Sequence, residues 1–173
     1  MTMNKQEDLV VLVPDRNWEA TVKSLLENRT RALSIRRVQY AVHIHPGRDS
    51  GVYHQSGAFL RSMQNRYQFA MVCVDQEWSG SPQDPEDIQR KIQGDLNDCG
   101  WRDRSCVIVA NPELEAWVWS DSPQVDAVLG WPCEGRQLRE WLTARGLLQR
   151  GNAKPSRPKE AVETALQESR TIR

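Results

Sequence analysis

The chain has 173 residues, of which 39% are hydrophobic, and its 23 basic and 23 acidic side chains give a formal net charge of zero. This length suits one domain that buries roughly 70% of its unfolded surface, so no disulfide scaffold is needed. The start of the chain is polar and no apolar run approaches the roughly 20 residues of a membrane span, which predicts a cytoplasmic protein with no membrane partner. The four cysteines show no CxxC spacing, and we expect reduced, buried thiols.

The charges are unevenly distributed along the chain. Residues 1–74 carry ten Lys or Arg against six Asp or Glu, residues 75–133 carry four against twelve, and residues 134–173 carry nine against five. An acidic centre between basic flanks fits metal-assisted work on an anionic substrate, and it fits equally a solvated surface with salt bridges.

Strands and helices are predicted to alternate in the first part of the chain. A continuous apolar run at 9–13 predicts a buried strand, and apolar spacing predicts a helix over 18–28 with Asn17 as its N-cap. Alternating residues at 37–44 predict a strand near the edge of the sheet. The HPGRDSG loop follows, and then a short helix over 58–66.

The second part contains two more strands and then only helices. Buried strands are predicted at 69–74 and 106–110, separated by an amphipathic helix over 85–98 that Gly100 ends. Further helices are predicted over 113–119, 125–129, 138–145 and 158–169.

This alternation predicts an α/β fold: a mostly parallel, four-stranded Rossmann-like sheet flanked by helices, with a helical C-terminal extension. The predicted organisation is an α/β domain over residues 1–120 and a helical extension over 121–173 that packs on the same domain.

Acidic residues follow three of the four predicted strands. They are Asp15, Asp75, Glu77, Glu113 and Glu115. Parallel strands bring their carboxyl ends to one edge, where ligands bind in such sheets, and oxygen-rich clusters suit Mg²⁺ or Mn²⁺. The alternative is structural: Asp15 caps a helix, Asp75 opens a turn, and the two later glutamates form an acidic first helical turn.

The segments LVVLVPDRN, FAMVCVDQE and CVIVANPELEAWVW together resemble Toprim-related proteins of bacterial antiphage defence systems, of the methylation-associated type. The resemblance covers about Leu9 to Trp119. It implies a Toprim-like fold, an acid-base role for Asp15, Mg²⁺ binding by Asp75 and Glu77, and completion of the site by Glu113 and Glu115. In the family pattern the first acid is Glu and the later motif is DxD, whereas this chain has Asp15 and Asp-Gln-Glu at 75–77.

Basic and imidazole side chains close to these strand ends are candidates for contacting substrate phosphate. They are Arg16, His43, His45 and Arg48. His43 and His45 are two residues apart on a strand and therefore face the same way, so they form an alternative Zn²⁺ or transition-metal set with Asp49 and His54. Structural roles for the histidines, with Asp49 in a turn, are the other interpretation.

Six of the seven tryptophans lie between residues 78 and 141. Trp117 and Trp119 cannot both face inward on one helix, so we expect one of them to bind a protein partner. The basic stretch GNAKPSRPKE fits either contact with a phosphate backbone or a solvated linker.

The chain has no GxxxxGK[ST], GxGxxG, GxSxG or HExxH motif, which argues against nucleotide kinases, dinucleotide oxidoreductases, α/β-hydrolases and zincins. Two hypotheses remain. The first is a Toprim-like, Mg²⁺- or Mn²⁺-dependent nuclease or nucleic-acid-processing subunit of an antiphage system. The second is a non-catalytic Toprim-like module that binds other proteins of a defence complex.

Overall fold

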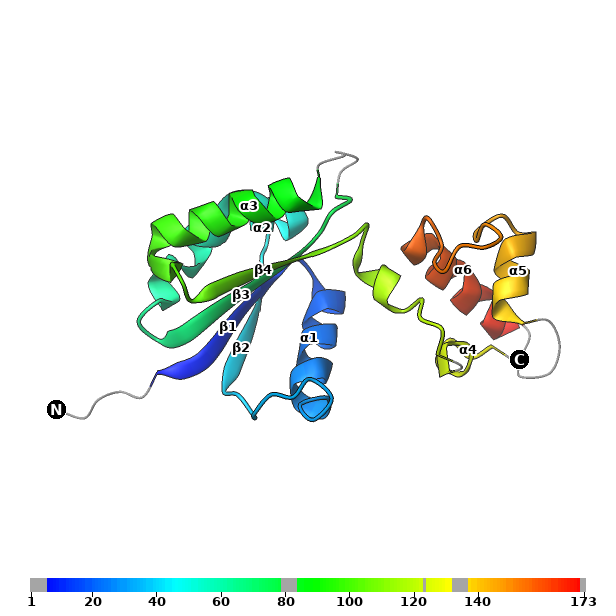
Figure 1. Ribbon diagram of the computed structural model, residues 1–173, viewed down its shortest axis with the longest axis horizontal. Coiled ribbons are helices and arrows are strands. Elements are labelled where there is room, and N and C mark those ends of the chain that lie inside the picture. Colours follow the sequence, from blue (N-terminus) through cyan, green and yellow to red (C-terminus); the bar gives the residue numbers. More distant parts are fainter. Residues whose placement is uncertain (1–5, 79–83, 123, 132–136, 172–173) are drawn as a thin grey trace. The chain divides into compact units, whose positions relative to one another are not determined.

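The computed structural model describes residues 6–78, 84–122, 124–131 and 137–171. Its contacts divide the chain into two compact units, Met1–Ala110 and Asn111–Arg173. Figure 1 shows that the first unit contains the whole sheet and that the second is helical. No helix among the described residues is both long enough and apolar enough to cross a membrane.

The first unit is built on a four-stranded, all-parallel sheet in the order β2-β1-β3-β4. Its strands are β1 (Glu7–Val13), β2 (Tyr40–Ile44), β3 (Tyr67–Asp75) and β4 (Ser105–Ala110). The two central strands, β1 and β3, contain the longest buried apolar runs, because each has a hydrogen-bonded neighbour on both sides. The predicted fold class and the edge position of β2 are confirmed.

Helices cover both faces of this sheet (Figure 1). On one face lie α2 (Arg48–Leu60), which continues into a 3₁₀ turn at Arg61–Met63, and α3 (Pro85–Leu96). The other face carries α1 (Arg16–Asn28), which packs against β1 and β2. Phe69 of β3 remains 50% exposed.

The core between the sheet and α2 and α3 is apolar. Its largest side chains are those of Leu12, Leu60, Tyr67, Ile88, Ile92, Leu96 and Trp101. A π-helical turn over Asn97–Trp101 follows α3, and Gly100 adopts a φ of 85° there. This left-handed conformation favours glycine and ends the helix, as the sequence predicted.

The prediction for α2 was wrong at its start: the helix begins at Arg48, whereas the sequence predicted residue 58. Two glycines with polar neighbours made the segment look like a loop. However, a Cβ at Gly57 would lie 2.6 Å from the backbone oxygen of Asp95, so glycine is what allows α2 and α3 to approach closely. The tertiary packing therefore outweighs the low helix propensity of this segment.

The cysteines are unpaired, but they are not uniformly buried. Cys73 is buried in β3, as predicted, and burial raises the pKa of its thiol. Cys99 is partly exposed, and Cys106 is exposed on the edge strand β4, so the prediction of burial was wrong for Cys106. Cys133 lies outside the described residues.

The second unit is a small helical body with its own core. It contains a 3₁₀ turn (Leu114–Trp117), α4 (Gln124–Val128), α5 (Leu138–Ala144) and α6 (Pro158–Thr171). The core includes Trp119, Leu129, Trp131, Trp141 and Leu142. Trp119 is 2% exposed and Trp117 is 45% exposed, which confirms that the two do not both face inward.

Candidate functional site

The candidate site lies where β1 and β3 end. The chain leaves β1 for β2 on one side of the sheet and later returns to form β3 on the other side. Such a reversal opens a crevice at the carboxyl ends of parallel strands, where α/β proteins commonly bind ligands. Asp15 comes two residues after β1, and Asp75 is the last residue of β3.

Trp18, in the first turn of α1, holds both of these carboxylates. Its backbone N–H donates a hydrogen bond to Asp15 Oδ1 at 3.0 Å, and its indole Nε1–H donates to Asp75 Oδ1 at 2.8 Å. Asp15 has an extended backbone and is the N-cap of α1, so the prediction that Asn17 caps this helix was wrong. A carboxylate accepts hydrogen bonds well at this position and also interacts favourably with the helix dipole.

A third carboxylate joins this network from α2. The backbone N–H of Asp75 donates to Oδ1 of Asp49 at 3.1 Å. Asp49 lies in the first turn of α2 and is partly buried, so its predicted place in a loop turn was wrong. The sequence grouped Asp49 with the histidines as a possible metal ligand. Its contact with Asp75 could not be predicted, because it depends on the fold that brings the start of α2 to the end of β3.

The remaining predicted acids have other environments. Glu77 is exposed just beyond β3. Glu113 and Glu115 belong to the second unit, where Glu113 Oε1 accepts a hydrogen bond of 2.7 Å from the backbone N–H of Lys159, in the first turn of α6. Glu113 therefore stabilises the start of that helix.

His45 is buried at the end of β2 and is 4% exposed. Its backbone N–H donates to Val13 O at 2.9 Å, and its Nδ1 accepts from the backbone N–H of Gly47 at 3.0 Å. Burial lowers the pKa of His45. The acceptor role of Nδ1 assigns the proton of the neutral ring to Nε2, so His45 is an uncharged group at neutral pH.

The other histidines divide between two environments. The rings of His43 and His45 both lie against Phe59, at centroid distances of 6.2 and 5.1 Å, which confirms that they face the same way. His54 instead lies against Tyr53 and Trp78, at 4.8 and 6.2 Å. These contacts do not gather the three rings into one set.

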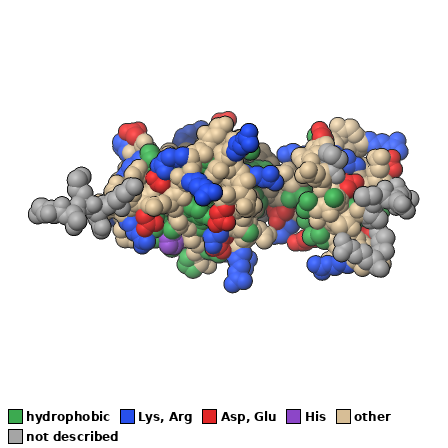
Figure 2. Space-filling model, turned by 90° about the horizontal axis from the view of Figure 1, so that it is seen from below, with side chains coloured by type: hydrophobic (Ala, Val, Ile, Leu, Met, Phe, Trp, Pro, Cys, Tyr) green, Lys and Arg blue, Asp and Glu red, His purple; other side chains and the backbone are tan. Residues whose placement is uncertain are grey.

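The two predicted arginines lie at the start of helices near this edge. Arg16 and Arg48 are the first residues of α1 and α2, and both are exposed. Arg48 has a φ of 51°, an uncommon conformation for a residue with a side chain. Figure 2 shows basic and acidic side chains interspersed over the visible face of the first unit.

Within the described part of the chain, no three His, Cys, Asp or Glu side chains are arranged as a group that could hold a metal ion. The absence of such a group weighs against Zn²⁺ more than against Mg²⁺. A Zn²⁺ site is normally completed by three or four protein ligands. Mg²⁺ keeps several waters and is usually held by one or two carboxylates together with substrate phosphates. The carboxylates at this edge therefore suit Mg²⁺ with a phosphate ligand better than Zn²⁺ held by the histidines.

The fold and the site define a Rossmann-like α/β unit with hydrogen-bonded carboxylates at its switch point. No family model, curated protein or solved structure matches the chain.

Proposed function

We propose that the chain is a Toprim-like, metal-dependent subunit that cleaves or otherwise processes nucleic acid, in the setting of a bacterial antiphage system. The setting comes from the resemblance of its strand-end motifs to defence-associated Toprim proteins. Asp75 is the main carboxylate for Mg²⁺ or Mn²⁺ in this proposal, with Glu77 or Asp49 as the second. Asp15 serves as the base or as a further ligand.

One observation carries this proposal: Trp18 is hydrogen-bonded to both Asp15 and Asp75. The Toprim pattern requires an acid after the first strand and a metal-binding acid after a later strand. The sheet order makes β1 and β3 neighbours, and Trp18 is hydrogen-bonded to one acid through its backbone N–H and to the other through its indole. A divalent cation at this edge would neutralise the carboxylates and orient the phosphodiester that is to be cleaved.

The test is a cleavage assay on plasmid and on single strands with Mg²⁺ or Mn²⁺. Asp75→Asn keeps the size and the acceptor oxygen but removes the charge, and we expect cleavage to fall by about a hundredfold or more. Asp98→Asn is the matched control, because Asp98 is exposed in the turn that follows α3 and leads into the amino end of β4. Direct titration of Mn²⁺ into both variants measures metal affinity separately from cleavage.

Equal cleavage by the wild type and Asp75→Asn, or no cleavage with either metal, would favour the second candidate. This is a non-catalytic Toprim-like module that binds other proteins of a defence complex. The observation in its favour is the 45% exposure of Trp117, since tryptophan is enriched among the residues that dominate binding energy at interfaces. Purification of the tagged chain from its native host, beside Trp117→Ala, tests this candidate through the loss of one specific partner.

A further inference from the structure

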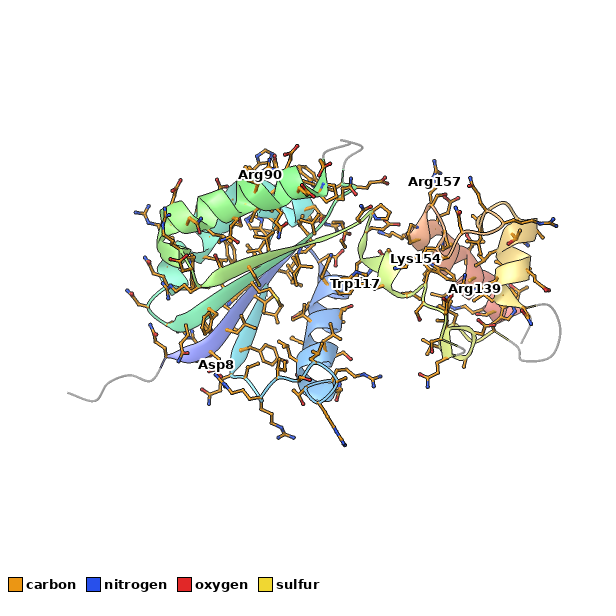
Figure 3. All side chains as sticks on the ribbon, in the orientation of Figure 1. Asp8, Arg90, Trp117, Arg139, Lys154 and Arg157 are labelled. Atoms are coloured by element: carbon orange, nitrogen blue, oxygen red, sulfur yellow. The ribbon has the colours of Figure 1, made fainter. Side chains whose placement is uncertain are left out.

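The segment that joins α5 to α6 is strongly basic, together with the first two residues of α6. Residues 145–159 contain Arg145, Arg150, Lys154, Arg157 and Lys159, and no Asp or Glu. The whole segment is described by the structure, and most of its side chains are exposed. Figure 3 shows Lys154 and Arg157 of this segment, together with Arg139 of α5, on the helical unit.

This segment has a defined conformation. Leu148 and Pro155 are buried, so both ends of its exposed part are anchored in the helical unit. Between them, the backbone N–H of Asn152 donates to Gln149 O at 3.1 Å, which closes a turn. Arg139 Nη1 donates to Ala153 O at 2.9 Å and ties the turn to α5. The basic side chains are thus presented from an ordered backbone, which lowers the entropic cost of binding.

The positive charges on this surface differ in how they are engaged. Arg145 pairs with Glu168 at 3.3 Å and stacks on Trp141, and Arg157 pairs with Glu160 at 3.2 Å. Arg150 and Lys154 are exposed and form no ion pair within the described residues. Their charges are therefore available to an external anion, and exposed pairs such as that of Arg157 are weak enough to exchange partners.

A cavity of about 670 Å³ opens beside the turn. It is lined by Arg139 and Arg150, by the polar side chains of Thr143, Gln149 and Asn152, and by one carboxylate, Glu140. Amides and guanidinium groups of this kind donate hydrogen bonds to phosphate oxygens and to sugar hydroxyls.

We infer that the turn between α5 and α6, together with this cavity, binds the phosphodiester backbone of a nucleic acid. Repeated cations on an ordered segment match a polyanion with regularly spaced charges. An anionic membrane is the less suitable partner, because residues 145–159 include none of the exposed large hydrophobic side chains that anchor a surface in lipid. The inference does not depend on the chemistry at the carboxyl edge of the sheet, since a non-cleaving protein can use the same surface.

The test uses the full chain and measures the binding of labelled single- and double-stranded oligonucleotides by fluorescence anisotropy at 50 to 200 mM salt. We expect the logarithm of the wild-type association constant to fall linearly with the logarithm of the salt concentration. Arg150→Ala/Lys154→Ala is expected to weaken binding at least about tenfold at 50 mM salt and to reduce the salt slope by about 1.4 to 1.8, since each lost phosphate contact contributes roughly 0.7 to 0.9. Arg150→Lys/Lys154→Arg keeps the charges and is expected to keep the binding.

The matched control is Arg29→Ala/Arg31→Ala, which removes two exposed arginines from the first unit. It is expected to bind like the wild type. Thermal unfolding of all variants checks that the exposed substitutions leave the fold intact. The inference is overturned if the wild type does not bind either oligonucleotide at 50 mM salt, or if the control loses as much affinity as Arg150→Ala/Lys154→Ala. It is equally overturned if the chain binds anionic vesicles but no oligonucleotide.

Discussion

The indole of Trp18 donates a 2.8 Å hydrogen bond to the carboxylate of Asp75, 57 residues further along the chain. This bond joins the first turn of α1 to the end of β3 and crosses the candidate site. Trp18 is also 1% exposed, so its ring is part of the packing between α1 and the sheet. One residue therefore contributes both to the stability of the unit and to the position of its central carboxylate.

Trp18→Phe is expected to lower the free energy of unfolding by about 2 to 4 kcal/mol. The substitution removes the donor to a charged acceptor and leaves a void in the packing. Asp75→Asn keeps an acceptor oxygen and is expected to cost less. Asp75→Ala removes the acceptor, so urea denaturation of Trp18→Phe, Asp75→Ala and the double variant measures the coupling, and strictly additive losses would show that the indole–carboxylate bond contributes nothing to stability.

Asp15→Ala is expected to lower the free energy of unfolding by about 1 kcal/mol, because it removes the side-chain acceptor that caps α1. Asp15→Asn can still accept the bond from Trp18 N and is expected to cost much less. Thermal or urea unfolding compares the two. In the cleavage assay, Asp15→Asn separates the roles: it retains the cap, so a loss of cleavage in this variant would reflect the missing charge.

Gly51→Ala is expected to destabilise the protein by about 1 to 3 kcal/mol. A Cβ at this position would lie 2.1 Å from Nδ1 of His45, whose ring is buried and cannot easily move. Gly94→Ala is the matched control in another helix, since a Cβ there meets nothing within 4 Å, and it is expected to stabilise by about 0.4 to 1 kcal/mol. A lower urea midpoint for Gly51→Ala and a higher one for Gly94→Ala would confirm both expectations. Similar shifts in the two variants would contradict the close packing of His45 against α2.

His45 is expected to make stability depend on pH below about 6.5. Its pKa is lowered from 6.5 in the folded state, so the unfolded chain binds a proton that the folded chain excludes. The neutral His45 ring makes its full contribution to the free energy of unfolding above pH 6.5, and this contribution is lost as the pH falls through the folded-state pKa. The free energy of unfolding, compared between pH 7.5 and 5.5, is expected to fall less in His45→Gln than in the wild type. His54→Gln, which alters an exposed ring, is the control and should retain the wild-type fall.

The strands were predictable because their signal is local. Continuous apolar runs such as Leu9–Val13 are what a strand buried on both faces requires, and they located β1, β3 and β4 to within two residues. The same runs placed Asp15 and Asp75 near strand ends. That Trp18 holds both acids was not predictable, because it depends on how α1 packs against its sheet.

The start of α2 shows why other features could not be predicted. Glycines at 51 and 57 weaken the helical signal, yet in the folded chain they allow α2 to lie close to His45 and to the backbone of α3. Asp49 consequently moves from a predicted turn into the first turn of a helix, where it accepts the N–H of Asp75.

The sequence by itself determined the α/β class, the parallel strands and the acids that follow them, because hydrophobic periodicity and strand ends are properties of short segments. Only the tertiary structure decided which acids share a network. Trp18 bonds locally to Asp15, and the long-range bonds from Trp18 to Asp75 and from Asp75 to Asp49 complete the network, whereas Glu113 accepts an N–H of α6 in the second unit. The sheet order decided this grouping, because it made β1 and β3 neighbours and so brought Asp75 to Trp18, a residue 57 positions earlier in the chain.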